Sequence, residues 1–222
     1  MSHQAVLPLV SFPPLERRKP IDPPAARDAR RHRALRRGNQ VALGTTAEPW
    51  VPAPDRPELA ALRGFEGLEV AITTRSPEIL GDLERLVELD RRCSVTVDMM
   101  LAAVDPFLVR RLEPGAADAR ARLRAVAGLA AEGIAVRILC TPLCAGLNDR
   151  EPALRAFMAA ARDAGAADVL AGTAPEPTSR FVLLRDILTG RRAPEADLDP
   201  RLAGFRRLKL EFGFPRLSAG RG

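Results

Sequence analysis

The sequence is poor in several residue types that mark particular classes of protein. Its 222 residues include three cysteines, two histidines, one tryptophan and no tyrosine. Three cysteines cannot build the disulfide framework of a small secreted domain, and they suit a reducing compartment. No apolar run approaches the roughly 20 residues of a membrane-spanning helix, and no charged segment followed by an unbroken apolar stretch marks a signal peptide. We therefore expect a cytoplasmic protein without a membrane segment.

Lysine is also scarce, since Lys19 and Lys209 are the only two and all other positive charge is arginine. Residues 1–40 hold nine Lys/Arg and three Asp/Glu, out of 34 and 28 in the whole chain, so residues 41–222 are balanced. A basic leader of this kind can bind nucleic acid or an anionic surface. The abundance of Arg, Ala, Gly and Pro offers a compositional explanation instead, and both interpretations stay open.

Three regions follow from the composition. Residues 1–40 form a basic, proline-rich leader, which we expect to be poorly ordered over residues 1–26 and to hold a short arginine-rich helix over 25–37. Residues 41–190 form the core, and residues 191–222 form a polar tail in which 205–214 is a candidate helix that docks back. A chain of this length can bury a substantial core in one domain with extensions.

The core alternates between short apolar runs and longer amphipathic segments. The predicted strands are 41–44, 68–73, 93–98, 134–140 and 167–171. The predicted helices are 57–63, 76–91, 105–112, 117–132, 151–164 and 178–188. Regular strand–helix alternation is typical of βα units in a parallel sheet with right-handed crossovers. We therefore predict an α/β fold whose parallel βα repeats form a partial TIM-type barrel or an open sheet.

The stretch Val41–Pro52 carries the first candidate site. Its apolar strand stops at Gly44, which allows close approach of backbone to a ligand, and Thr45 and Glu48 supply polar groups. Trp50 could form an apolar wall. Ligands of parallel sheets bind at the carboxyl ends of the strands, where this loop lies. The alternative is a strand-to-loop turn whose tryptophan caps the core.

The third strand predicts a second set of candidates by its alternation. Val95 and Val97 share one face, while Ser94, Thr96 and Asp98 share the other. In a partial barrel the first set meets the helices and the second lines the lumen. An exposed edge face is the alternative.

We expect the side chains that follow the strands to share one pocket mouth. Glu48, Thr74, Asp98 and Asn148 all sit at or near predicted strand carboxyl ends. A different hypothesis takes Glu48, Asp98 and Glu113 as acid/base groups of an unrelated α/β enzyme. Nothing in the sequence brings those three carboxylates together.

Four motifs follow one another along the core. They are Gly44-Thr45 with Glu48-Pro49-Trp50, then Thr74-Arg75-Ser76 with Asp82, then Glu113-Pro114, and last Pro142 with Gly146-Leu147-Asn148-Asp149. In this order they resemble the radical SAM superfamily, in the branch grouped with spore photoproduct lyase and with DNA-repair-like radical SAM proteins. The resemblance covers about residues 41–188. It implies a partial TIM-type barrel that uses S-adenosylmethionine and a [4Fe–4S] cluster for radical chemistry.

The resemblance also implies roles for particular residues. Those implied beside the methionine moiety of the cofactor are Gly44, Thr45, Glu48 and Pro49. Those implied for its ribose are Ser94, Thr96 and Asp98, and those for the adenine-side loop are Asn148 and Asp149. Catalytic residues remain unassigned.

Two departures set this chain apart from the family pattern. In the family, the cluster loop Cys-x3-Cys-x2-Cys precedes the strand that corresponds to residue 41, and this sequence has no cysteine before that residue. The family also has an arginine just after its last strand, whereas this chain has Gly172-Thr173-Ala174-Pro175, which contains no basic residue. Cys140 and Cys144 have the first spacing without a third partner, so we predict no metal ligands. We expect either a radical SAM protein that is N-terminally incomplete or degenerate, and inactive as written, or a cluster-less nucleotide- or nucleic-acid-binding module that keeps the scaffold.

Overall fold

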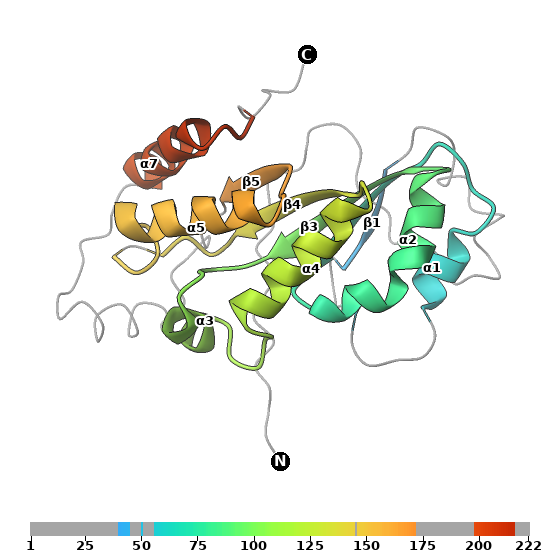
Figure 1. The fold of residues 1–222 in the computed structure, drawn as a ribbon, viewed down its shortest axis with the longest axis horizontal. Helices are drawn as coiled ribbons and strands as arrows, with labels where there is room; N and C mark the ends of the chain where they lie inside the picture. The colour runs from blue at the N-terminus through green and yellow to red at the C-terminus, as the bar shows by residue number, and fades with distance from the viewer. Residues whose placement is uncertain (1–39, 45–49, 51–55, 145, 172–197, 216–222) are drawn as a thin grey trace.

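The computed structural model describes residues 40–44, 50, 56–144, 146–171 and 198–215 (Figure 1). One sheet contains the strands β1 (Gln40–Leu43), β2 (Glu69–Thr74), β3 (Ser94–Met100), β4 (Ala135–Cys140) and β5 (Asp168–Ala171). The strands lie in sequence order, and each pairs in parallel with the next. The predicted α/β architecture is confirmed, and it matches part of a TIM-type barrel.

The helices lie between and after the strands. They are α1 (Pro57–Ala61), the 3-10 helix η2 (Pro77–Asp82), α2 (Leu83–Asp90), α3 (Pro106–Leu112), α4 (Ala119–Ala131), α5 (Glu151–Asp163) and α7 (Leu198–Glu211). The prediction of one helix over 76–91 was wrong in part. Asp82 leaves helical geometry, with φ −109° and ψ 15°, so the segment divides there. The helices predicted at 25–37 and 178–188 lie outside the described residues.

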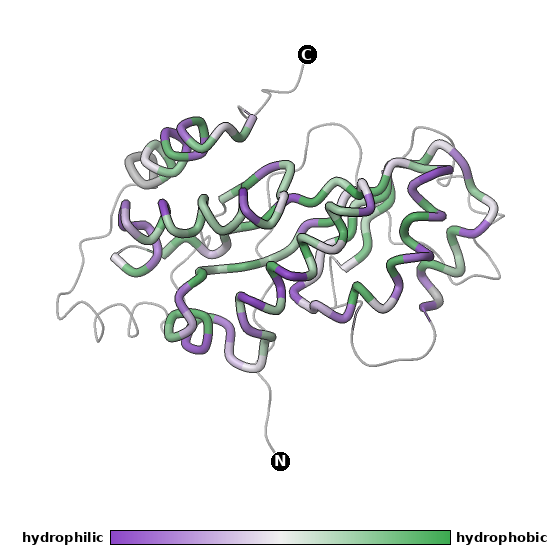
Figure 2. Tube along the Cα trace, in the orientation of Figure 1, coloured by the Kyte–Doolittle hydropathy of each residue, from purple (hydrophilic) through white to green (hydrophobic). Residues whose placement is uncertain are grey.

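Helices α2, α4 and α5 lie on the same face of the sheet (Figure 1). Every second strand residue points into the core beneath them, and Figure 2 shows the apolar character of the strands. The strand residues at most 2% exposed on this face include Val70, Ile72, Val95, Val97, Val136, Ile138 and Val169. The predicted inward set of the third strand, Val95 and Val97, is confirmed.

The other face of the sheet, which we call the open face, is partly accessible. Glu69 and Ser94 are exposed on it, while Ala71, Thr73 and Thr96 are half-buried. A parallel sheet in a globular protein is normally covered on both faces and reads as continuous apolar sequence. Here the strands alternate instead, which is the pattern of a barrel wall with one face toward a lumen.

Side-chain caps fix where the helices begin. Ser76 Oγ accepts a hydrogen bond from a backbone N–H at the start of η2, as predicted. Asp105 does the same for α3 with two N–H groups at 2.7 and 3.1 Å, and Asp118 for α4 at 2.6 Å. These caps satisfy amide groups that a helix leaves without a partner at its first turn.

The tail helix α7 packs against α5 and β5. Phe205 and Leu208 of this helix are buried in the main core. The helix runs over 198–211 rather than 205–214. None of the helices in the described part of the chain combines the length and apolar character needed to span a bilayer.

Candidate functional site

The loop after β1 begins with a backbone turn that favours glycine. Gly44 has φ 79°, in the left-handed region, where an L side chain would be strained. Three residues of the predicted cofactor set lie outside the described residues, namely Thr45, Glu48 and Pro49. Trp50 is 2% exposed, and its indole Nε1 donates to Asp82 Oδ2 at 3.0 Å. The tryptophan therefore fills the core and is anchored to Asp82.

Asp82 is the centre of this anchor. Besides the indole, it accepts hydrogen bonds from Arg56 Nε at 2.8 Å and Arg85 Nη1 at 2.7 Å. Burial alone would raise the pKa of Asp82, but the bonds from Arg56, Trp50 and Arg85 lower it on balance. The sequence motif pointed to Asp82, whereas its three donors come from other segments and could not be assigned from spacing.

A row of alternating charges crosses the open face. Asp98 accepts two bonds from Arg137, at 2.6 Å from Nε and 2.7 Å from Nη2. The strand register places Asp98 beside Arg137, and Arg137 beside Asp168. Lys209 Nζ of α7 lies 2.7 Å from Asp168 Oδ1. We call Asp98, Arg137, Asp168 and Lys209 the charged row.

Burial and pairing act in opposite directions within the charged row. Burial raises the pKa of Asp98, and the hydrogen bonds and charge of Arg137 oppose the rise. The bonds to Asp98 raise the pKa of Arg137, against the effect of burial. Two short parallel bonds are the geometry of a bidentate ion pair, so we take both groups as charged. Asp98 lies on the predicted lumen face, but its partner was missed, although a lone arginine between Val136 and Ile138 pointed to the same face.

Asn148 joins the loops that follow β3 and β4. Its amide nitrogen donates to the carbonyl oxygens of Ala102 at 2.6 Å and Pro142 at 3.0 Å, and its Oδ1 accepts from the N–H of Cys144 at 2.7 Å. Asn148 is only 3% exposed. Asn148 thus holds the carboxyl edge of the sheet together and offers little surface to a ligand.

The neighbouring Asp149 supports the same loop. Its Oδ1 accepts a hydrogen bond from the N–H of Gly146 at 2.6 Å. Gly146 has φ 71°, which suits glycine in this tight turn. The motif Gly-Leu-Asn-Asp therefore specifies a loop conformation in this chain.

Glu113 is paired in the core. Arg122 donates to both of its carboxylate oxygens, at 2.8 and 2.9 Å, and also to the carbonyl of Met100 at 2.8 Å. The N–H of Ala102 donates to Glu113 Oε2 at 3.1 Å. Both side chains are at most 6% exposed. This pair fixes the chain after β3 to α4, and it leaves Glu113 poorly placed for acid/base work.

Of the four residues expected to line one pocket mouth, the structure describes three. Thr74 is 1% exposed, and its Oγ1 accepts from the N–H of Ser76 at 3.0 Å. Asn148 is occupied as described above, and Asp98 lies two residues before the end of β3. Glu48 lies outside the described residues. At this edge the described polar groups mainly hold loops, and the open face beside the charged row offers more accessible polar surface.

The three cysteines do not converge. Cys93 precedes β3 and its Sγ donates to the carbonyl of Phe65 at 3.5 Å, while Cys140 ends β4 and its Sγ donates to Ala102 at 3.8 Å. Burial strongly raises the pKa of Cys140, which disfavours the thiolate that a metal needs. Among the described residues, no group of three or more His, Cys, Asp or Glu side chains is arranged to hold a metal ion.

The fold is similar to that of a solved spore photoproduct lyase mutant with bound AdoMet and dinucleoside spore photoproduct. The match has a TM-score of 0.56 and covers 85% of this chain and 62% of that chain, at 11% sequence identity. At this identity the likeness concerns the fold alone.

Sequence relatives occur in mycobacteria. Uncharacterized proteins of Mycobacterium bovis and Mycobacterium tuberculosis are 29% identical over 137 residues, which is 60% of this chain. The match spans only 40% of the length of those relatives. No family model matches the chain.

Proposed function

We propose that this chain is a radical SAM-type scaffold that binds S-adenosylmethionine against the open face of the sheet. The observation that carries the proposal is an accessible face on a parallel sheet, where small side chains adjoin the charged row. Ala71, Thr73 and Thr96 carry small side chains that are only half-buried there, and the likeness to a lyase that holds AdoMet supports the choice of ligand. Ser94 and Asp98 belong to the same face.

The donor set of this face suits the ligand. S-Adenosylmethionine carries hydroxyl, amino and carboxylate groups, and a positive sulfur. Asp98 and Asp168 supply acceptors and negative charge, and Arg137, whose side chain is 24% exposed, supplies N–H donors. When bound, the cofactor would supply the source of an organic radical.

The cluster does not fit the cysteines that the structure describes. Cys93 and Cys140 lie at opposite ends of neighbouring strands, so their thiolates cannot bind neighbouring irons of one cluster. We therefore derive no electron-transfer or radical step from the residues of this chain.

Calorimetry with S-adenosylmethionine tests the proposal. Thr96→Phe should fill the open face and abolish binding, because the ring would occupy the space beside the charged row. Ala127→Phe is the matched control, since Ala127 is exposed on α4, on the helix-covered side of the sheet. Equal binding by wild type and Thr96→Phe, or no binding by folded wild type, would refute the site.

The alternative is a cluster-independent nucleotide-binding module, which the separation of the cysteines favours. Anaerobic reconstitution with iron and sulfide, followed by iron counting, distinguishes the two. We expect no stoichiometric iron. Close to four irons per chain, lost in Cys140→Ala/Cys144→Ala, would instead indicate a working cluster enzyme.

A further inference from the structure

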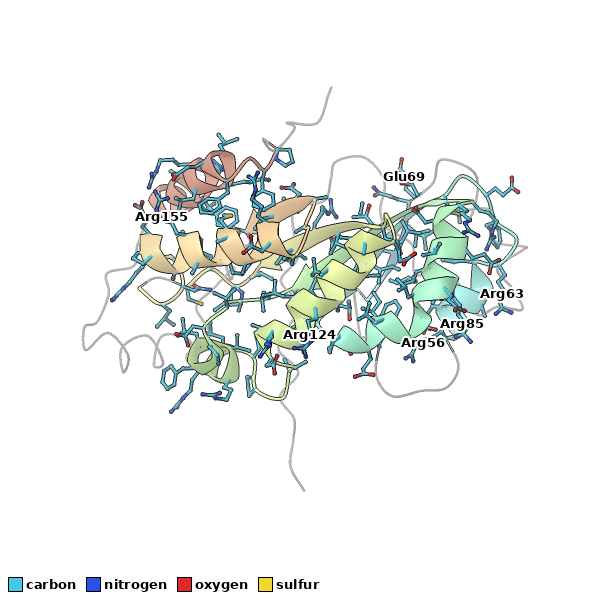
Figure 3. The ribbon with its side chains drawn as sticks, viewed as in Figure 1. Arg56, Arg63, Glu69, Arg85, Arg124 and Arg155 are labelled. Carbon is cyan, nitrogen blue, oxygen red and sulfur yellow. The ribbon has the colours of Figure 1, made fainter. Side chains whose placement is uncertain are left out.

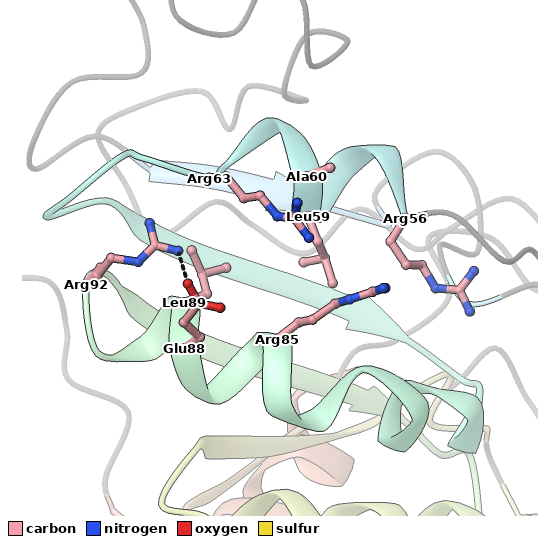
Figure 4. A pocket seen from close by; sticks show the side chains of 8 residues that line it. All are labelled: Arg56, Leu59, Ala60, Arg63, Arg85, Glu88, Leu89 and Arg92. Carbon is pink, nitrogen blue, oxygen red and sulfur yellow. Dashed lines mark ion pairs between the residues drawn. The ribbon is translucent and has the colours of Figure 1, made fainter.

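A cleft of about 230 Å³ opens between α1 and α2 (Figure 4). Its floor is apolar, formed by Leu59, Ala60 and Leu89, and its walls are charged. The charged lining residues are Arg56, Arg63, Arg85, Glu88 and Arg92. The cleft belongs to the helix-covered side of the sheet, so it is separate from the open face.

The arginines come as two pairs on facing segments. Arg56 and Arg63 flank α1, and Arg85 and Arg92 lie along and just after α2. The two members of each pair are seven positions apart in the sequence, at or near opposite ends of a short helix. Figure 4 shows the side chains of each segment reaching into the gap between the helices. In Figure 3, Arg56, Arg63 and Arg85 gather in this region, while Arg124 and Arg155 lie elsewhere.

Several guanidinium N–H groups in the cleft remain available to a ligand. Arg63 is exposed, and it has no hydrogen-bond or ion-pair partner among the described residues. Arg85 donates one N–H to Asp82, and its side chain is 50% exposed. Each guanidinium carries five N–H donors in a planar fork, so most donors of these two residues face the cleft or solvent.

The charge of the cleft is not balanced locally. Among the described residues, two carboxylates accompany the four arginines, namely Asp82, bound to Arg56 and Arg85, and Glu88, 3.6 Å from Arg92. Within this described set, arginine exceeds carboxylate by two charges. Like charges held this close together repel, and an anion bound between them relieves that repulsion.

We propose that this cleft binds a phosphoryl group, either as free phosphate or as part of a nucleic-acid backbone. Arginine recognises phosphate through paired N–H bonds to two oxygens, and it keeps its charge at all physiological pH values. Arg63 and Arg85 reach the bound group directly. Arg56 and Arg92, held by Asp82 and Glu88, shape the cleft and add to its positive potential.

The experiment compares three variants of the full chain. Arg63→Ala/Arg85→Ala removes the two available guanidinium groups, and Arg63→Lys/Arg85→Lys keeps charge but loses the fork. Arg120→Ala/Arg124→Ala is the matched control, because it removes the same charge from exposed positions on α4. Arg63→Ala alone guards against misfolding, since Arg63 holds no partner among the described residues.

Two probes identify the source of the phosphoryl group. Fluorescence anisotropy measures binding of a labelled 12-nucleotide single-stranded DNA, and calorimetry measures binding of inorganic phosphate. For whichever probe binds wild type, we expect the double alanine variant to weaken binding roughly tenfold, because charge-assisted bonds are lost. The control should stay near wild type, and the lysine variant should lie between.

For the DNA probe, the plot of log affinity against log salt should also flatten by about one to two for the double alanine variant. Binding of phosphate alone would assign the cleft to a free anion, and binding of DNA would assign it to a backbone. The proposal is overturned if wild type binds neither probe. It is equally overturned if the double alanine variant and the α4 control lose affinity to the same extent, which would point to general charge, including that of residues 1–40.

Discussion

The buried Arg122–Glu113 ion pair is held by several contacts. Arg122 is fully buried and donates to both oxygens of Glu113 and to a backbone carbonyl, while Glu113 also accepts from a backbone N–H. Removing one member leaves the other charged and without water, which costs more than the pair itself contributes. The pair therefore matters through the penalty of breaking it.

Glu113→Ala should lower the free energy of unfolding by roughly 3–5 kcal/mol, because it strands the Arg122 guanidinium in the core. Urea unfolding followed by circular dichroism measures the change. Glu88→Ala is the matched control, and it should change stability by less than about 1 kcal/mol, since exposed ion pairs contribute little. Glu88 is 70% exposed at its side chain. A loss no larger than that of the control would contradict the structural role of Glu113.

Asp82 makes the free energy of unfolding depend on pH, and the direction of that dependence follows from its pKa. Its pKa is lowered from 3.8 in the folded protein, so the folded state favours the carboxylate. The stabilisation is fully present above 3.8, and it is lost as the pH falls through the lowered folded pKa. The difference in unfolding free energy between wild type and Asp82→Asn should therefore be constant near neutral pH and shrink below 3.8. Unfolding curves from pH 7 to pH 2.5 test it, and an unchanged difference across that range would show that Asp82 is not the titrating group.

At the scale of elements, single side chains cap the starts of η2, α3 and α4. Asp118 caps α4 through one bond of 2.6 Å, and α4 packs against η2 and β4. Asp118→Ala should cost about 1 kcal/mol of stability, because one amide of the first turn loses its acceptor. Asp118→Ser should retain most of the stability, since serine also caps. Equal losses in both variants, measured by urea unfolding, would rule out capping as the cause.

The elements show what sequence can and cannot predict. Strand positions followed from alternation, because Val95 and Val97 point to the core and Thr96 between them does not. The start of α3 followed from Asp105 before Pro106. The division of residues 77–90 at Asp82 did not follow, because the bonds that hold Asp82 come from Trp50 and Arg56, outside its own helix. Long-range partners of polar groups leave no local signal.

Prediction of the candidate site from sequence was limited in the same way. The resemblance selected Asp98, Asn148 and Glu113 as notable positions, but type and spacing could not tell a ligand-binding side chain from one that holds a loop. Asn148 bonds to carbonyls on two separate loops, and this depends on how β3 and β4 lie side by side. The α1–α2 cleft was missed because its arginines lie in and around two separate helices, in a chain rich in arginine throughout.

At the scale of the whole molecule, α7 is tied to the sheet by a buried ion pair. Lys209 is 3% exposed at its side chain and reaches Asp168 on β5, while Arg155 and Glu211 link α5 and α7 at the surface. Lys209→Met should lower the unfolding free energy by about 1–3 kcal/mol, because Asp168 loses its cation. Arg155→Ala should change it by less than about 1 kcal/mol.

Asp168→Asn in the Lys209→Met background provides the check. It should recover part of the lost stability, since the uncompensated charge is removed. Asp168→Asn in the wild-type background gives the reference loss of stability. If Asp168→Asn causes the same loss in the Lys209→Met background, the two residues are not coupled.

The charged row also has a consequence for how such sequences diverge. Its members come from β3, β4, β5 and α7, and each lies beside an opposite charge supplied by the next. A change at position 209 alone meets selection against a stranded Asp168, so the two positions should drift as a pair, both charged or both neutral. Positions 98 and 137 should do the same, and an exchange of the two side chains should be tolerated more readily than either replacement alone. Homologous sequences should then show correlated substitutions between these positions, although the positions lie in separate segments of the chain.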